Sequence, residues 1–108
     1  MPDLLNVHVG LDGRTARVTA RGEVDLSTAG MLKSAIDDAC GAHGVTAVVL
    51  DLTGVSFLGG TGLAVLLKAK QKCATRDLTL ALHGSKPVQR TVEISGLADD
   101  LPVQPAPP

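Results

Sequence analysis

The segment Gly59-Gly60-Thr61-Gly62 has residue types that could hold a phosphate group. Glycines let the backbone approach an anion closely, and a helix that begins there offers free amide groups. A Walker A loop would need a lysine and a serine or threonine after the last glycine, where this chain has Leu63 and Ala64. Nucleotide binding therefore remains one alternative function. The Thr61 hydroxyl could accept a phosphate itself, or it could cap the helix.

Acid, base or nucleophilic catalysis requires titratable side chains that converge on one point. The three histidines are far apart in the sequence, at His8, His43 and His83, and no Gly-x-Ser-x-Gly motif is present. Each histidine falls at a surface position of an expected strand or helix end. The sequence therefore predicts a protein that is not an enzyme.

The two cysteines, Cys40 and Cys73, are too few for a four-ligand zinc site or a disulfide scaffold. We expect no metal and no cofactor. Each cysteine lies on the apolar stripe of an expected helix, where it could be a small buried hydrophobic residue. Both also lie near the C-terminal ends of these helices. A redox pair that forms a regulatory disulfide is therefore the alternative interpretation.

Apolar periodicity places these residues on alternating strands and helices. An alternating pattern with an Asp12-Gly13 turn predicts a β-hairpin, and a continuous apolar run predicts a central strand that is buried on both faces. Ser27 or Thr28 could cap the first helix. The expected elements are strands 5–9 and 15–20, a helix from 27 or 28 to about 43, strand 45–52, a connection 54–60, a helix 61–75, strand 78–82 and a helix from 86 to about 95.

This order predicts an α/β fold with a mixed β-sheet, in which an N-terminal antiparallel hairpin is followed by parallel strands. About three to four helices are expected to pack on the sheet. The domain should span residues 1–103. Proline recurs from Pro102 to the end of the chain, so residues 104–108 are expected to form a weakly ordered, extended tail.

Composition excludes several classes of partner. The 108 residues carry 10 basic and 11 acidic side chains, and Phe57 is the single aromatic residue. Balanced charges do not attract a phosphate backbone, and one aromatic side chain cannot form a platform on which bases stack. No nucleic-acid partner is therefore expected. The longest apolar run, Leu63 to Leu67, is too short to span a bilayer, and the first residues, Met1 to Leu4, lack a signal-peptide pattern. We expect a cytoplasmic protein without membrane contact.

Three segments resemble the STAS domain family, and above all its anti-sigma factor antagonists. These segments are 51–66, the Gly22-Glu23-Val24-Asp25 motif, and 80–97. The resemblance implies a regulatory binding module that docks on an anti-sigma factor of the ATP-binding serine kinase type. Binding releases a sigma factor and thereby permits transcription. Phosphorylation of a serine at the start of the second helix ends the interaction, because it adds negative charge to the docking surface.

The chain departs from this pattern at the phosphoacceptor, because Gly60 stands where the family carries its serine. The protein could be permanently competent, could use Thr61, or could have lost kinase binding. A STAS subunit of a phospholipid-transport ABC system is a further alternative. The family's usual C-terminal helix is missing after Leu101, so a weak homodimer could cover an exposed sheet edge. The expected partner-binding residues are Asp25, Ser27, Thr28, Phe57, Leu58, Gly59, Gly60, Thr61 and Gly62.

Overall fold

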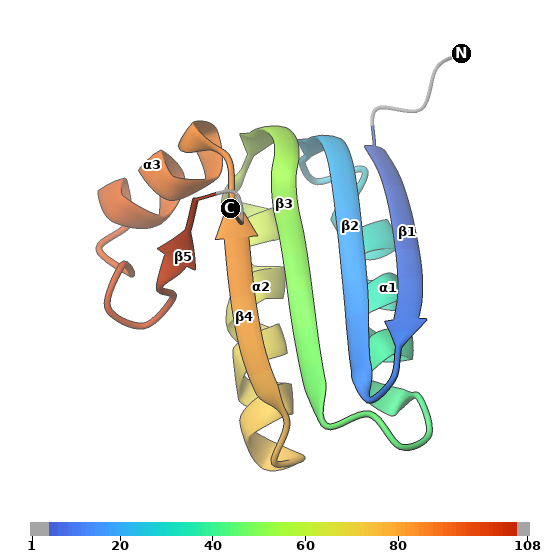
Figure 1. The fold of residues 1–108 in the computed structure, drawn as a ribbon. Coiled ribbons are helices and arrows are strands. Elements are labelled where there is room, and N and C mark those ends of the chain that lie inside the picture. Colours follow the sequence, from blue (N-terminus) through green and yellow to red (C-terminus); the bar gives the residue numbers. More distant parts are fainter. Residues whose placement is uncertain (1–4, 106–108) are drawn as a thin grey trace.

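The computed structural model describes residues 5–105 and shows a five-stranded mixed sheet with helices packed on it (Figure 1). The strands lie in the order β1-β2-β3-β4-β5. β1 and β2 are antiparallel, and every later neighbouring pair is parallel. The predicted fold class is confirmed, with three helices in the described range. The elements are β1 Leu5–Asp12, β2 Thr15–Val24, α1 Ala29–Gly41, β3 Ala47–Leu58, α2 Gly60–Thr75, β4 Thr79–Gly84, α3 Lys86–Ile94 and β5 Val103–Gln104.

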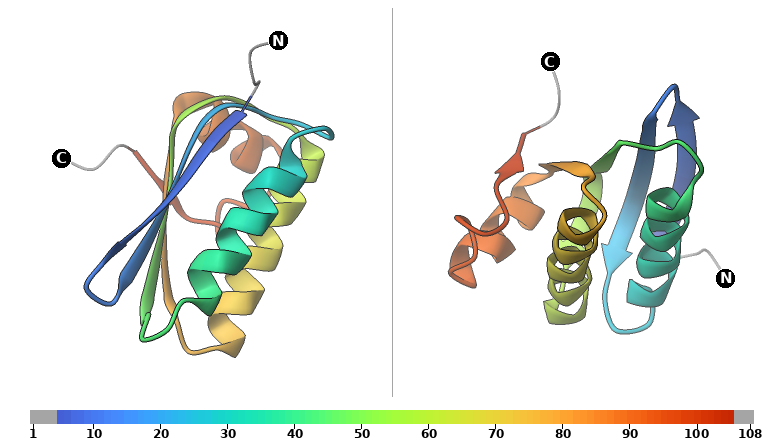
Figure 2. Two further views of the ribbon diagram at one scale, coloured as in Figure 1. Left: turned by 90° about the vertical axis from the view of Figure 1, so that its right-hand side faces the viewer. Right: turned by 90° about the horizontal axis from the view of Figure 1, so that it is seen from below.

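Helices α1 and α2 lie side by side on the same face of the sheet (Figure 2). This follows from topology, since right-handed crossovers that add strands in one direction place their helices on one side. The prediction that the third strand is buried on both faces was therefore wrong. Val48, Leu50 and Leu52 point into the core and are buried, whereas Val49 and Asp51 face the other side and are only partly covered.

The predicted hairpin is present, but β1 extends beyond residue 9 to Asp12, with Gly13 at a positive φ of 61° in the turn. Glycine suits this left-handed conformation because it lacks a Cβ atom. The first helix ends at Gly41 rather than near His43. Among the described residues, no helix is both long and apolar enough to cross a membrane.

The expected connection at 54–60 is also different, because β3 continues through it to Leu58. Two shifts in the β2–β3 register add extra residues to β3 and allow pairing to resume, with Glu23 opposite Phe57 and Val24 opposite Leu58. Such bulges let a strand continue past an irregular segment. A Cβ atom on Gly54 would lie 2.8 Å from the Cγ atom of Arg21, so any larger residue here would require this exposed side chain to move.

The C-terminal segment differs from the expected tail. Val103 pairs with Leu82 and Gln104 pairs with His83, so this short strand extends the sheet across the expected domain boundary at residue 103. Leu101 before it is fully buried and anchors the segment. Burial of one apolar side chain and two strand pairs outweighs the tendency of the flanking prolines to leave the sheet. Residues 1–4 and 106–108 of the expected domain and tail lie outside the described residues.

Candidate functional site

The predicted partner-binding residues come from two segments that the sheet brings together. The loop between β2 and α1 carries Asp25 to Thr28, and the β3–α2 junction carries Phe57 to Gly62. Both segments leave the carboxyl ends of neighbouring parallel strands, so they lie at one edge of the sheet. The Gly59 amide donates a hydrogen bond of 2.9 Å to the Val24 carbonyl, which ties the two segments to each other.

The Asp25 side chain shapes the loop before α1. One carboxylate oxygen accepts hydrogen bonds from the Ser27 amide at 2.9 Å, the Ser27 hydroxyl at 2.7 Å and the Thr28 amide at 3.2 Å. These bonds, above all the one from the Ser27 hydroxyl, hold the pKa of the Asp25 carboxyl below its usual range. Asp25 therefore organises the loop and remains ionised at neutral pH, where it can also face a partner.

Thr28 is a loop-building residue, and the expectation that it contacts a partner does not fit its burial. Only 6% of its surface is exposed. Its hydroxyl accepts from the Asp25 amide at 2.9 Å and donates to the Glu23 carbonyl at 2.8 Å. Thr28 occupies the N-cap position of α1, but its side chain makes no capping bond to the helix. The predicted capping role is therefore replaced by a bond to the preceding loop.

At the β3–α2 junction, strand alternation decides which side chains are accessible. Leu58 is buried, whereas Phe57 is 48% exposed, so of these two expected partner-binding residues only Phe57 offers its side chain to a partner. Gly62 is buried against Val24 and Leu58. Gly60 and Thr61 are exposed in the first turn of α2. Gly59 is the N-cap, and no side chain caps this helix, so the alternative capping role of Thr61 is not observed.

Sequence reasoning missed two apolar side chains at this site. Leu26, next to Asp25, is 84% exposed, and Met31 in the first turn of α1 is 46% exposed. A single leucine within a polar loop was the available signal for Leu26. We call the accessible residues Asp25, Leu26, Ser27, Phe57, Gly60 and Thr61 the loop surface.

Helix α3 borders the loop surface, which the sequence did not indicate. A cavity of about 260 Å³ lies between Phe57 and the start of α3, where Lys86, Pro87 and Arg90 line it. The Thr91 hydroxyl donates to the Leu58 carbonyl at 3.2 Å and holds α3 against the end of β3. The loop surface thus combines an aspartate, exposed apolar side chains and adjacent basic side chains. This combination fits protein recognition.

We expect Asp25→Ala to loosen the loop, because three donors lose their acceptor. Hydrogen exchange at the Ser27 and Thr28 amides should accelerate about tenfold. Folding lowers the pKa of the Asp25 carboxyl. In the wild type, protection of these amides from exchange should therefore persist above about pH 3.9, the ordinary pKa of aspartate, and should be lost only as the pH falls below it. Amide exchange measured by NMR at several pH values tests this. Unchanged exchange in the variant would mean that the carboxylate does not hold the loop.

The predicted redox residues do lie together, on neighbouring helices. The Sγ atoms of Cys40 and Cys73 are 3.9 Å apart and both side chains are buried. Burial, reinforced by the neighbouring Cys40 thiol, raises the pKa of Cys73 to about 12. Since the thiolate is the reactive form, proximity favours a disulfide whereas protonation opposes its formation. The redox pair stays a prediction.

We expect both thiols of the native protein to react slowly with a disulfide reagent at pH 7, and quickly after unfolding in urea. Once forced, the Cys40–Cys73 bond should raise stability by about 3 kcal/mol, because it closes a loop in the unfolded chain. Thiol titration and urea denaturation of the oxidised and reduced forms measure both effects. Rapid oxidation of the folded protein would instead establish the pair as a redox site, with Cys40→Ser as the control.

Within residues 5–105, no group of three histidine, cysteine, aspartate or glutamate side chains could hold a metal ion. Within the 59–62 segment, Gly62 is required for packing, because a Cβ atom there would lie 2.6 Å from side-chain atoms of Leu58 and Val24. This explains one glycine of the segment without a phosphate ligand. The loop surface exposes two hydroxyl groups, at Ser27 and Thr61, and the Ser27 hydroxyl donates to the Asp25 carboxylate.

Comparison with known proteins gives a consistent picture. The STAS domain model matches residues 9–107. The anti-sigma-F factor antagonist RsfB of Mycobacterium tuberculosis is 39% identical over 96 residues, covering 89% of this chain and 78% of the relative. An anti-sigma factor antagonist from Mycobacterium paratuberculosis superposes with a TM-score of 0.85 at 29% identity, covering 98% of this chain and 90% of that one.

A more distant neighbour shares the fold. The anti-sigma factor antagonist SpoIIAA in its unphosphorylated form gives a TM-score of 0.76 at 18% identity, covering 94% of this chain and 89% of that chain. Its phosphorylated form from Bacillus gives a TM-score of 0.71 at the same identity. The family match covers most of the sequence and agrees with the observed order of strands and helices. The chain belongs to the STAS domain family.

Proposed function

We propose that this protein is an anti-sigma factor antagonist, a regulatory binding protein rather than an enzyme. RsfB and the Mycobacterium paratuberculosis structure carry this name, and the similarity extends over most of both chains. The single observation that carries the proposal is the loop surface itself. Leu26 and Phe57 expose apolar side chains to solvent, and Leu26 directly follows Asp25, whose carboxylate is held by hydrogen bonds. Exposed apolar residues of this size are typical of the centre of a protein interface.

The partner in this proposal is an anti-sigma factor of the ATP-binding serine kinase type. Its capture by the loop surface would release a sigma factor and allow transcription, which takes place in the cytoplasm. Gly60 has no hydroxyl, so the partner could not switch the protein off at this position. Thr61 is the neighbouring exposed hydroxyl and the remaining candidate phosphoacceptor.

The test is a binding measurement with each anti-sigma factor encoded in the source genome, in the presence and absence of ATP. Leu26→Ala combined with Phe57→Ala should weaken binding by at least about tenfold, because both changes remove exposed apolar contacts. Leu11→Ala is the matched control. Leu11 is also exposed, at 63%, but it pairs with Ala16 near the start of β2, whereas the loop surface follows the end of β2. Equal loss in the control would contradict the assignment of the loop surface.

Other outcomes favour the alternatives. Co-purification with a transporter ATPase would support the phospholipid-transport subunit, and a higher melting temperature with ATP or GTP would support nucleotide binding. Sedimentation at several protein concentrations tests the weak homodimer. Absence of binding to every anti-sigma factor would overturn the proposed function.

A further inference from the structure

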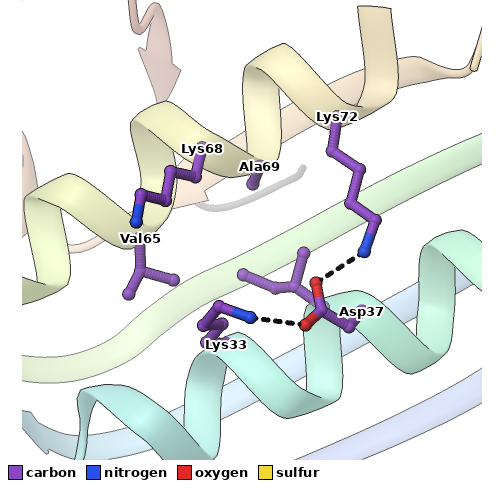
Figure 3. Close-up of a pocket in the computed structure, with 7 residues that line it drawn as sticks. Lys33, Asp37, Val65, Lys68, Ala69 and Lys72 are labelled. Carbon is purple, nitrogen blue, oxygen red and sulfur yellow. Dashed lines mark hydrogen bonds and ion pairs between the residues drawn. The ribbon is translucent and has the colours of Figure 1, made fainter. Parts of the chain in front are cut away.

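A groove runs between α1 and α2 on the outer side of the helical layer (Figure 3). It encloses about 200 Å³. Ile36, Val65 and Ala69 supply its apolar lining, and three lysines with one aspartate supply its polar lining. Its lining runs from Lys33 to Asp37 on α1 and from Val65 to Lys72 on α2, so it begins in the second turn of each helix. On α2 the lining therefore starts about one helical turn after Thr61 of the loop surface.

The charges in the groove are unbalanced. Asp37 accepts hydrogen bonds from Lys33 on its own helix and from Lys72 on α2, each at 2.8 Å. These two bonds, with Lys33 contributing most, hold the pKa of the Asp37 carboxyl below its usual range. Lys68 has no ion-pair partner within the described part of the chain, and Figure 3 shows its amine beside Val65. The groove lining thus contains three ammonium groups and one carboxylate, which pairs with two of them.

The positive charge continues along α2. Lys68, Lys72 and Arg76 recur at four-residue spacing, which places them on one face of the helix or its end. The Arg76 guanidinium donates to the Cys40 carbonyl at 3.3 Å, so it also lies at the seam between the helices. The whole chain carries a formal charge of -1. A basic strip on a slightly acidic protein therefore marks this seam as distinct from the average surface.

We propose that the α1–α2 groove binds an acidic amphipathic helix of the anti-sigma partner. Charge complementarity requires carboxylates on the occupant, and the apolar lining around Val65 requires apolar side chains between them. A third helix lying along the groove of two packed helices satisfies both demands. A nucleotide fits less well, because the groove contains no aromatic side chain on which a base could stack.

This inference rests on the proposed function and adds the chemistry of the partner. The loop surface at the N-termini of α1 and α2 provides the first contact, and the groove extends that contact along both helices. Lysine ammonium groups at the rim should act mainly on the association rate and make it dependent on salt. The groove thus distinguishes acidic partners from basic ones.

The test compares Lys68→Glu with Lys70→Glu, a change of the same charge on the other side of α2, where Lys70 lies 4.0 Å from Asp100. Lys68→Glu should weaken binding of an anti-sigma factor about tenfold at low salt, and less at about 0.15 M salt. Lys70→Glu should leave affinity unchanged. If wild type binds and both variants bind equally well, the groove inference is overturned while the proposed function stands.

A second measurement does not depend on the anti-sigma factor. Three ligands are titrated separately into the isotope-labelled protein, and NMR chemical shifts are recorded. They are an acidic amphipathic helical peptide, its counterpart with lysine in place of glutamate, and inorganic phosphate. Shifts confined to residues lining the groove with the acidic peptide alone support the inference. Equal shifts with phosphate would indicate a small-anion site and overturn the helix-binding inference. Shifts with the basic peptide, or no shifts with any of the three ligands, would also overturn it.

Discussion

Replacing Gly60 with serine is expected to create a phosphoacceptor at this position for the proposed kinase-type anti-sigma factor. Gly60 is exposed, and an added Cβ atom would meet no other atom within 4 Å. The serine hydroxyl would stand in the first turn of α2, whose backbone amides no side chain caps. A phosphate there gains from the positive end of the helix dipole.

The same phosphate should end binding. It adds about -1.5 to -2 charge beside Phe57 and thereby requires desolvation of an anion within an apolar contact. We expect phosphorylated Gly60→Ser to bind the anti-sigma factor at least about a hundredfold more weakly than the unmodified variant, from the combined repulsion and desolvation. Phosphate-affinity electrophoresis and titration calorimetry, after incubation with the kinase and ATP, measure the two effects.

Gly60→Ala and Thr61→Ala separate the possible acceptors. Gly60→Ala adds the same Cβ atom without a hydroxyl, so it should remain unmodified and bind like wild type. A phosphate shift in wild type that disappears in Thr61→Ala would show that Thr61 is the acceptor and that the chain is switchable as it stands. Failure of Gly60→Ser to accept phosphate would contradict the placement of the family's phosphoacceptor at this residue.

The fold was predictable because its order follows from local patterns. Alternation with an Asp12-Gly13 turn gives the hairpin, and helical spacing gives three helices between strands. Periodicity does not indicate where strand pairing continues through an irregular segment. The extra residues of β3 are accommodated by bulges where β3 pairs with β2. The resulting register leaves Phe57 exposed and Leu58 buried.

The candidate site was predictable only as a segment. Motif resemblance placed it at the β2–α1 loop and at the start of α2, but burial within these segments depends on how they pack. Thr28 is enclosed because its hydroxyl bonds the loop on two sides, and Leu26 is left exposed by the same turn. Similarly, spacing alone predicts the Lys33–Asp37 pair, while the Asp37–Lys72 contact requires α1 and α2 to be adjacent.

Gly62→Ala should destabilise the protein, whereas Gly60→Ala should not. A Cβ atom on Gly62 would lie 2.6 Å from both the Leu58 Cδ1 and the Val24 Cγ1 atoms, and 3.3 Å from the Val24 Cβ atom. Val24 is fully buried in β2 and stiff at χ1, so it cannot move aside without shifting the strand. Overpacking of this kind costs about 1–3 kcal/mol.

Gly60→Ala isolates this packing effect from helix propensity. Both glycines lie in the first turn of α2, and alanine favours a helix over glycine by up to about 1 kcal/mol at an interior position. Gly60→Ala should therefore be neutral or stabilising, and the two variants should differ in melting temperature by about 10 °C. Gly62→Ala should also bind the anti-sigma factor more weakly, because α2 must move away from β2 and carries Thr61 with it. Equal stability of the two variants would show that the close contact at Gly62 does not determine how α2 is seated.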